Sequence, residues 1–387
     1  MKKKINLCVV ITARPSYARM KTALQAIKES EYLNLHIIAT GSLLLDRYGN
    51  PVNVIKQDGF DVISELHTLF EGEDLISGPK STAIQLMELT TEFIRIKPDA
   101  VITIADRYET ISTAIAASYM NIPLIHIQGG EITGSIDEKV RHAITKLSDL
   151  HLVSTEDAKK RVIKMGEEEK RVITTGCPSI DLAKLVIEKK PYLEDDVWKK
   201  YTYVGSNLSL KEKYIVLMHH PVTTQYEMNK DDTQEILNTI EFLDINVFCF
   251  WPNPDAGANG VSNAIRTFRE KTEKKNIAFF KNIEPEDFIR LLNGAECLIG
   301  NSSVGIRESS FLGLPVINIG NRQQFRLRGK NVIDVESNRQ QILPALGKQI
   351  EHGKYEKNFI YGNGNAGINI AKAILDWDFS LKKAITY

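Results

Sequence analysis

The sequence contains few cysteines and no long apolar run. Its four cysteines lie far apart, without the paired spacing typical of zinc sites or disulfide frameworks, so we expect buried, reduced thiols at Cys8, Cys177, Cys249 and Cys297. No stretch approaches the roughly 20 apolar residues that a membrane helix needs. The basic start, MKKK, precedes an apolar run that is too short and too polar for a signal peptide. We therefore expect a cytoplasmic protein that has no membrane partner.

An excess of charge of one sign is also absent. Forty-nine basic residues balance forty-nine acidic ones, so no overall field favours nucleic acid as a partner. The first strand-to-helix turn lacks the G-x-G-x-x-G pattern of dinucleotide-binding proteins, and no cluster of side chains has metal-ligand spacing. We expect no metal and no cofactor, and an anionic small ligand would need local hydrogen-bond donors.

The sequence does contain a regular alternation of short apolar runs and amphipathic helical patterns. In the first half the apolar runs are "INLCVVIT", "NLHIIAT", "DAVITIA", "PLIHIQ", "DLHLVST" and "RVITTG". A second series extends from "YIVLMHH" to "KNVIDV". Strand and helix in alternation predict βαβ units. The predicted fold class is α/β, with two Rossmann-like, doubly wound parallel-sheet domains.

The alternation pauses over residues 181–213, which are charged and aromatic and show little strand character. This stretch is typical of a linker or a helical crossover. Since 387 residues exceed one ordinary α/β core, we place an N-terminal domain at 1–180 and a C-terminal domain at 181–364. Ligands of open α/β sheets bind beyond the carboxyl ends of the strands, so polar residues there are the candidates for function.

One such place is "ECLIGNSSVGIRESSFLG", where a predicted strand ends and a helix is expected to begin. The free N-H groups of a helix N-terminus bind phosphate, Ser302 and Ser303 add hydroxyl donors, and Gly305 permits close approach. Glu308, expected one turn inside the helix, can accept hydrogen bonds from ribose hydroxyls. Helix capping alone would also explain the serines. The combination favours a nucleotide site.

Carboxylates follow two strands of the first half. Asp106 ends "VITIA", and Glu131 follows two glycines in "HIQGGEITGSIDEKVRH", with Asp137 at the start of the next helix. Asp106 could merely cap a helix. Several acids at one sheet edge are what proton transfer at carbon requires.

Two further features carry candidate residues. His219 and His220 are adjacent in a predicted strand, so their side chains point to opposite faces and cannot share one metal; we select His220 as the functional one. Arg14 opens the first strand-to-helix turn, where it can contact an anion or simply be a solvated surface side chain.

These motifs together resemble the hydrolysing UDP-N-acetylglucosamine 2-epimerases. The resemblance extends through "TARPSY", "ADRYE", "GGEITGSIDEKVRHAITKLS", "HHPVTT", "WPNPDAG", "GNSSVGIRES" and "INIGNRQ". It implies a glycosyltransferase-B arrangement with the active site in the interdomain cleft, a C-terminal helix at 365–387 that packs back on the first domain, and a homodimer or homotetramer. The UDP-binding residues that it implies are Arg14, Arg107, Asn253, Ser302, Ser303, Gly305, Glu308 and Arg322.

The resemblance also implies the chemistry. UDP is eliminated to give a 2-acetamidoglucal, and hydration of the glycal releases UDP and the C2-epimerised free sugar, N-acetylmannosamine, for sialic acid synthesis. The catalytic residues that it implies are Asp106, Glu131, Asp137 and His220.

Alternatives remain open at this point. Many relatives carry an acid two residues after the arginine of the first strand-to-helix turn, where this chain has Ser16. Similar enzymes of legionaminic acid synthesis act on a different sugar, a nucleotide-linked 2,4-diacetamido-2,4,6-trideoxyhexose. A retaining glycosyltransferase would share the nucleotide site but needs no proton transfer at C2. A nucleotide-sugar sensor would not need the acids, and a metal-dependent hydrolase would need ligand spacing that is not seen.

Overall fold

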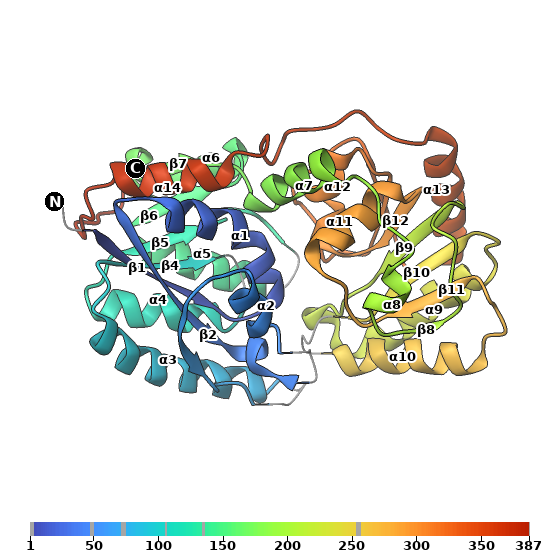
Figure 1. Cartoon of the computed structure of the whole chain (residues 1–387), viewed down its shortest axis with the longest axis horizontal. Coiled ribbons are helices and arrows are strands. Elements are labelled where there is room, and N and C mark those ends of the chain that lie inside the picture. Colours follow the sequence, from blue (N-terminus) through green and yellow to red (C-terminus); the bar gives the residue numbers. More distant parts are fainter. Residues whose placement is uncertain are drawn as a thin grey trace. The chain divides into compact units, whose positions relative to one another are not determined.

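The computed structural model describes residues 4–46, 50–70, 75–104, 107–133, 136–252 and 257–386 (Figure 1). The chain divides into two compact units. Unit 1 comprises residues 1–131, 136–182 and 361–387, and unit 2 comprises residues 132–135 and 183–360. Each unit is built around its own sheet, so the predicted class of two α/β domains with parallel sheets is confirmed.

Unit 1 contains a parallel seven-stranded sheet of order β3-β2-β1-β4-β5-β6-β7. Its strands are β1 (Ile5–Ile11), β2 (Leu33–Thr40), β3 (Val62–Leu66), β4 (Ala100–Ile104), β5 (Leu124–Ile127), β6 (Leu150–Val153) and β7 (Val172–Thr174). The central strands are buried and mostly apolar because helices cover both faces, as in other parallel sheets. The register places Ile5 beside Leu33 and Leu7 beside Ala100.

The helices of unit 1 follow the strands in regular succession. They are α1 (Arg14–Glu29), α2 (Val52–Gln57), α3 (Ser77–Ile96), α4 (Thr110–Tyr119), α5 (Asp137–Leu147), α6 (Glu156–Lys164), the start of α7 (Pro178–Lys189) and α14 (Ala366–Asp376), with short 3₁₀ turns η1 (Gly41–Leu44) and η3 (Glu169–Arg171). The red helix α14 lies along the dark blue helix α1 in Figure 1. Ile370 and Ile374 of α14 enter the same hydrophobic core as Met20 and Leu24 of α1.

Unit 2 contains a second seven-stranded sheet, of order β14-β13-β12-β9-β10-β11-β8. Its strands are β8 (Tyr203–Gly205), β9 (Tyr214–Met218), β10 (Asn246–Phe250), β11 (Ile277–Phe280), β12 (Cys297–Gly300), β13 (Val316–Ile319) and β14 (Val332–Val335). Its helices are the rest of α7, α8 (Val197–Lys200), α9 (Asn229–Glu241), α10 (Ala258–Lys271), α11 (Pro285–Gly294), α12 (Glu308–Leu312) and α13 (Arg339–His352), with 3₁₀ turns η4 (Thr223–Met228) and η5 (Ser303–Gly305). All strands are parallel except β8, which pairs antiparallel with β11.

Two edge strands and one helix differ from the sequence prediction. β3 was not predicted, because this edge strand is only half-buried and carries Ser64 and Glu65. The stretch 181–213 was expected to have little strand character, but β8 lies within it, where Tyr203 stacks on Phe280 and Trp198 packs against both rings. The helix expected over 365–387 ends at Asp376, and the chain from Trp377 to Thr386 is not helical.

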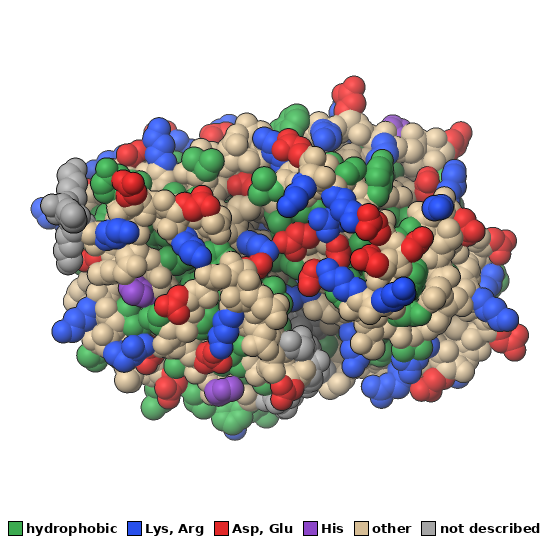
Figure 2. Space-filling model, in the orientation of Figure 1, with side chains coloured by type: hydrophobic (Ala, Val, Ile, Leu, Met, Phe, Trp, Pro, Cys, Tyr) green, Lys and Arg blue, Asp and Glu red, His purple; other side chains and the backbone are tan. Residues whose placement is uncertain are grey.

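The remaining observations concern composition. All four cysteines are free and buried, as predicted, and burial raises the pKa of the Cys249 thiol to about 12. Figure 2 shows acidic and basic side chains intermingled over the displayed face. Within the described residues, no helix is long and apolar enough to cross a bilayer.

Candidate active site

At the carboxyl edge of the unit 1 sheet, loops position Arg14 and Arg107. Arg14 is the first residue of α1 and lies three positions after Ile11, the last residue of β1. Pro15 fits the first turn of the helix because an N-H at that position would have no partner within the helix. Arg107 follows β4, and its Nε donates to Glu109 Oε1 at 2.6 Å; both side chains are largely buried. Asp106, the predicted acid of this loop, lies outside the described residues.

The loop after β5 holds the backbone in a left-handed conformation at two positions. Gln128, a buried non-glycine residue, has φ 64°, and Gly130 has φ 75°. A Cβ on Gly130 would meet the carbonyl oxygen of Ala158 at 2.6 Å, so only glycine fits there. Strained backbone of this kind clusters at functional sites. Glu131, the next residue, is 4% exposed.

Helix α5 begins with Asp137 and is tied to this loop through Arg141. The Arg141 side chain is fully buried, and its Nη1 donates to the Glu131 carbonyl oxygen at 2.9 Å and to Glu138 Oε2 at 3.3 Å. His142 Nε2 lies 2.8 Å from Glu138 Oε1. One buried guanidinium therefore ties the backbone of Glu131 to α5, the helix that begins at Asp137.

In unit 2, Asn301 fixes the ends of neighbouring strands β9 and β12. Its Oδ1 accepts from the His220 N-H at 2.7 Å, and its Nδ2 donates to the His220 carbonyl at 2.8 Å. Its own carbonyl accepts from Arg322 Nη1 at 3.2 Å and from Gln323 Nε2 at 2.9 Å. The preceding residue must be glycine, since Gly300 has φ 136° and a Cβ there would lie 2.0 Å from the Met218 carbonyl oxygen. Asn301 thus joins His220 and Arg322 in one network.

Both histidines of this network are buried and neutral at physiological pH. Burial, and to a lesser extent the Arg322 guanidinium, lowers the pKa of His219 to about 4. The pKa of His220 is also well below its usual value, through burial, Arg322 and His219 in that order. A neutral His220 can donate one hydrogen bond, and the fixed positive charge beside it belongs to Arg322.

The "NSSVGIRES" segment is less helical than the sequence suggests. Ser302 precedes η5, a 3₁₀ turn of three residues, and α12 begins only at Glu308 and is five residues long. Glu308 was expected one turn inside a helix and instead is its first residue, with Arg307 at the N-cap. Glu308 Oε2 is buried and makes no hydrogen bond to the described residues.

Gly305 has a packing reason to be glycine. A Cβ on Gly305 would lie 3.0 Å from Val316 Cγ1 and 3.4 Å from Leu298 Cδ2, within the core of unit 2. Ser302 and Ser303 remain partly exposed beside it. Asn253, predicted to bind UDP, lies outside the described residues.

Acid should destabilise unit 2 through His219. The unfolded histidine takes up a proton near pH 6.5 but the folded one only near pH 4, so the free energy of unfolding falls as pH is lowered through this window. We expect His219 alone to account for a loss of about 2 kcal/mol between pH 7 and pH 5. His219→Gln should remove this part of the pH dependence of the free energy of unfolding. The measurement is urea unfolding in a Trp377→Phe background, where Trp198 and Trp251 report on unit 2.

The control for this experiment is His352→Gln, which removes an exposed histidine from the same unit. Equal pH dependence in His219→Gln and the parent would contradict the neutral, buried state of His219.

Two residues that organise the site were not selected from the sequence. Asn301 directly follows the glycine that ends β12, where asparagine is usually read as a turn residue. Arg141 lies one turn after Asp137, and a single arginine on a helix normally suggests a solvated face. No group of three or more His, Cys, Asp or Glu side chains among the described residues could hold a metal ion.

Comparison with known proteins identifies the family. The family model described as UDP-N-acetylglucosamine 2-epimerase matches residues 25–375. The UDP-N,N'-diacetylbacillosamine 2-epimerase (hydrolyzing) of Legionella pneumophila is 33% identical over 359 residues, covering 93% of this chain and 92% of that one. The UDP-N-acetylglucosamine 2-epimerase of Neisseria meningitidis serogroup B is 30% identical over 359 residues, covering 93% and 91%.

A solved structure agrees with this assignment at the level of the fold. The UDP-GlcNAc 2-epimerase from Neisseria meningitidis, crystallised with UDP-GlcNAc, superposes with a TM-score of 0.79 at 18% identity, covering 96% of this chain and all of that one. The family expected from the sequence motifs is confirmed by the family model and by relatives that align over nearly the whole length. The chain belongs to the UDP-N-acetylglucosamine 2-epimerase family.

Proposed function

We propose that this protein is a hydrolysing 2-epimerase that converts a UDP-linked 2-acetamido sugar and water into UDP and the free sugar inverted at C2. The observation that carries the proposal is the Asn301 network. It places the Arg322 cation, a neutral histidine and the Ser302 loop at neighbouring strand ends of unit 2. Donors and a cation suit a diphosphate, and the buried carboxylate oxygen of Glu308 suits ribose hydroxyls.

In the proposed reaction, unit 2 binds UDP and unit 1 supplies the acid and base. One carboxylate removes the C2 proton while UDP leaves C1, which gives the glycal. Water then adds at C1 and a proton arrives at C2 on the opposite face. The base and acid are drawn from Asp106, Glu131 and Asp137.

The departing diphosphate carries the developing negative charge. His220 and Arg322 stabilise that charge in this proposal, together with Arg14, Arg107, Asn253, Ser302 and Ser303. Because His220 is neutral, its contribution is a hydrogen bond rather than a full charge. Gly305 serves by keeping the Ser303 turn close to the sheet.

For the sugar, we favour a 2,4-diacetamido-2,4,6-trideoxyhexose. The Legionella pneumophila relative, at 33% identity, is a UDP-N,N'-diacetylbacillosamine enzyme by name. UDP-N-acetylglucosamine, the substrate first expected from the motifs, becomes the second candidate, supported by the 30% identical enzyme of Neisseria meningitidis. The reaction at C1 and C2 is the same for both.

The test is incubation with each UDP-sugar in deuterated water, followed by proton NMR. We expect UDP and a free 2-epimerised sugar with deuterium at C2, formed faster from the diacetamido substrate. Faster turnover of UDP-N-acetylglucosamine would reverse the choice of sugar. UDP release without deuterium at C2 would contradict the epimerase proposal and favour simple hydrolysis or glycosyl transfer. A parallel sample with a strong chelator should react equally fast, and loss of activity there would indicate a metal-dependent hydrolase.

A further inference from the structure

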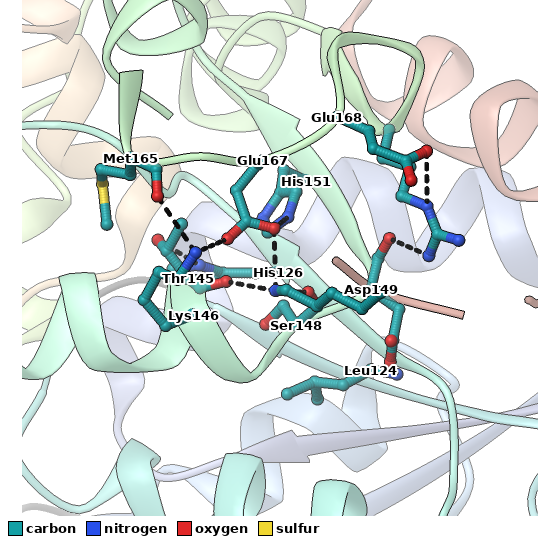
Figure 3. A network of polar contacts seen from close by, with 12 residues as sticks. Leu124, His126, Thr145, Lys146, Ser148, Asp149, His151, Met165, Glu167 and Glu168 are labelled. Carbon is teal, nitrogen blue, oxygen red and sulfur yellow. Dashed lines mark hydrogen bonds and ion pairs between the residues drawn. The ribbon is translucent and has the colours of Figure 1, made fainter. Parts of the chain in front are cut away.

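A polar cluster around a buried carboxylate of unit 1 has no part in the proposed chemistry. We name it the Glu167 cluster, and it comprises Lys146, His151, Glu167 and Lys383. Figure 3 shows Lys146 and His151 pointing toward the Glu167 carboxylate. Glu167, whose side chain is 2% exposed, accepts from Lys146 Nζ at 2.5 Å, His151 Nε2 at 3.0 Å and Lys383 Nζ at 2.8 Å. The four residues come from parts of the chain as distant as α5 and the C-terminal region.

The cluster carries a fixed negative charge at its centre. Burial acts to raise the pKa of Glu167, but hydrogen bonds from His151, Lys146 and Lys383 lower it to about 2. Burial lowers the pKa of His151, so its ring is neutral at pH 7. Two ammonium groups therefore face the single carboxylate, and removal of Lys383 would leave that buried charge with fewer donors.

Lys383 belongs to a non-helical stretch, residues 378–386, which we name the tail segment. Arg171 Nη1 donates to the Ser380 carbonyl at 2.9 Å, and Arg171 also bonds the Lys382 carbonyl. The Thr386 N-H donates to the Gly166 carbonyl at 3.0 Å. The tail segment is thus held at several points along its length.

From there Lys383 reaches the C-terminal end of α5. Its Nζ donates to the Ser148 carbonyl at 2.5 Å and to the Thr145 carbonyl at 3.3 Å. Carbonyls at a helix C-terminus lack partners within the helix, and a cation there also interacts favourably with the helix dipole. Lys146, in the same turn, donates to the Met165 carbonyl at 3.0 Å.

The opposite end of α5 carries the candidate catalytic groups. It begins at Asp137, and Arg141 holds the Glu131 carbonyl at 2.9 Å. In its last turn, Thr145 Oγ1 lies 3.3 Å from His126 Nδ1, and a Cβ on Gly129 would lie only 3.1 Å from the same hydroxyl. Because helix and loop pack without spare room, a shift of α5 along its axis would move the loop that carries Glu131.

We propose that Lys383, seated on Glu167, is a positioning residue of the active site: it fixes the C-terminal end of α5, and thereby the placement of Asp137 and Glu131. The effect on turnover rests on the proposed function. The effect on the order of α5 and of the 128–131 loop does not.

The experiment replaces Lys383 with methionine, which keeps the apolar stem and removes the donors and the charge. We expect amide exchange in α5 and in residues 128–131 to become at least about tenfold faster. We also expect kcat to fall by about tenfold while KM and UDP affinity stay nearly constant, because small misplacements of catalytic groups are costly. Lys383→Arg should restore at least half of both losses, since it keeps the cation.

The matched control is Lys382→Met, which removes an exposed lysine from the same segment and should change neither readout. Glu167→Gln, which keeps the side-chain shape, provides an independent variant that should produce the same pattern as Lys383→Met. Unchanged exchange in α5 and the loop in both variants would overturn the inference. So would an equal effect of Lys382→Met.

Failure of the proposed function would look different. A wild-type protein that turns over neither UDP-sugar would contradict the proposed function, while exchange, measured on the free protein, would still decide the role of Lys383. Faster exchange with unaltered kcat in an active enzyme would overturn the positioning role in catalysis.

Discussion

Glu131→Gln is expected to reduce kcat by about a thousandfold or more, because a positioned acid or base contributes about 10² to 10⁴ to proton transfer. The side chain is buried in the loop after β5, and the exchange of one oxygen for an amide preserves its shape. UDP affinity should stay within about threefold of the wild type, since the UDP contacts are proposed in unit 2. Steady-state kinetics and calorimetric UDP titration measure the two effects separately.

The half-reactions can be separated by supplying the 2-acetamidoglucal with UDP. A variant that has lost only the base for elimination would still hydrate the glycal, whereas one that has lost the proton donor to C2 would not. Running Glu131→Gln and Asp137→Asn side by side assigns the two roles. Glu156→Gln, at an exposed position of α6, is the control for an acid-to-amide change. A Glu131→Gln enzyme within tenfold of the wild-type kcat would remove Glu131 from the proposed mechanism.

Asn301→Ala should produce the second large effect, on unit 2. The substitution leaves the buried N-H and carbonyl of His220 without their partners, at a cost of about 1 to 3 kcal/mol for each group. We therefore expect the free energy of unfolding of unit 2 to fall by about 2 to 5 kcal/mol. UDP affinity should fall by about tenfold or more, because His220 loses its side-chain anchor, while Arg322 keeps the backbone carbonyl of residue 301 as its acceptor. Fluorescence-detected unfolding and UDP titration give both numbers.

Asn301→Asp and Asn318→Ala make this prediction specific. The aspartate keeps an acceptor for the His220 N-H but adds negative charge beside the proposed diphosphate, so it should weaken UDP binding more than its effect on stability would suggest. Asn318 is also buried on this sheet and donates to Asp334 Oδ1 at 2.7 Å. Its alanine variant should lower stability and leave UDP affinity nearly unchanged. If Asn318→Ala weakened UDP binding as much as Asn301→Ala does, the loss of UDP affinity would follow from the loss of stability alone.

Most of the fold could be predicted because the central strands are buried on both faces. Runs such as "INLCVVIT" and "YIVLMHH" are apolar without alternation, which is typical of a parallel sheet between helices. Two of the edge strands, β3 and β8, gave no such signal. β3 is half-buried and polar, and β8 has three residues and depends on aromatic packing against Phe280, 77 positions away from Tyr203.

The candidate site could be predicted in part. Position at strand ends selected Glu131, His220 and Ser302, and the structure places each of them directly beyond a strand end or its loop. The sequence could not show that Asn301 holds His220, since the two lie 81 residues apart and meet only when β9 pairs with β12. Nor could it show that the 3₁₀ turn ends at Gly305 and that α12 begins only at Glu308, because Arg307 between them is a good helix former.

The split composition of unit 1 has a consequence for protein synthesis. Unit 2 is nearly continuous in sequence, but unit 1 needs α14 and the tail segment, which are translated after residue 360. At about 5 to 20 residues per second, the ribosome needs roughly 10 to 35 s for the ~180 residues between the two parts of unit 1. During that time the face of α1 that contacts Ile370 and Ile374 in the folded protein is not yet covered by α14. The nascent protein is therefore most exposed to association and to chaperones while unit 2, and not unit 1, is being made.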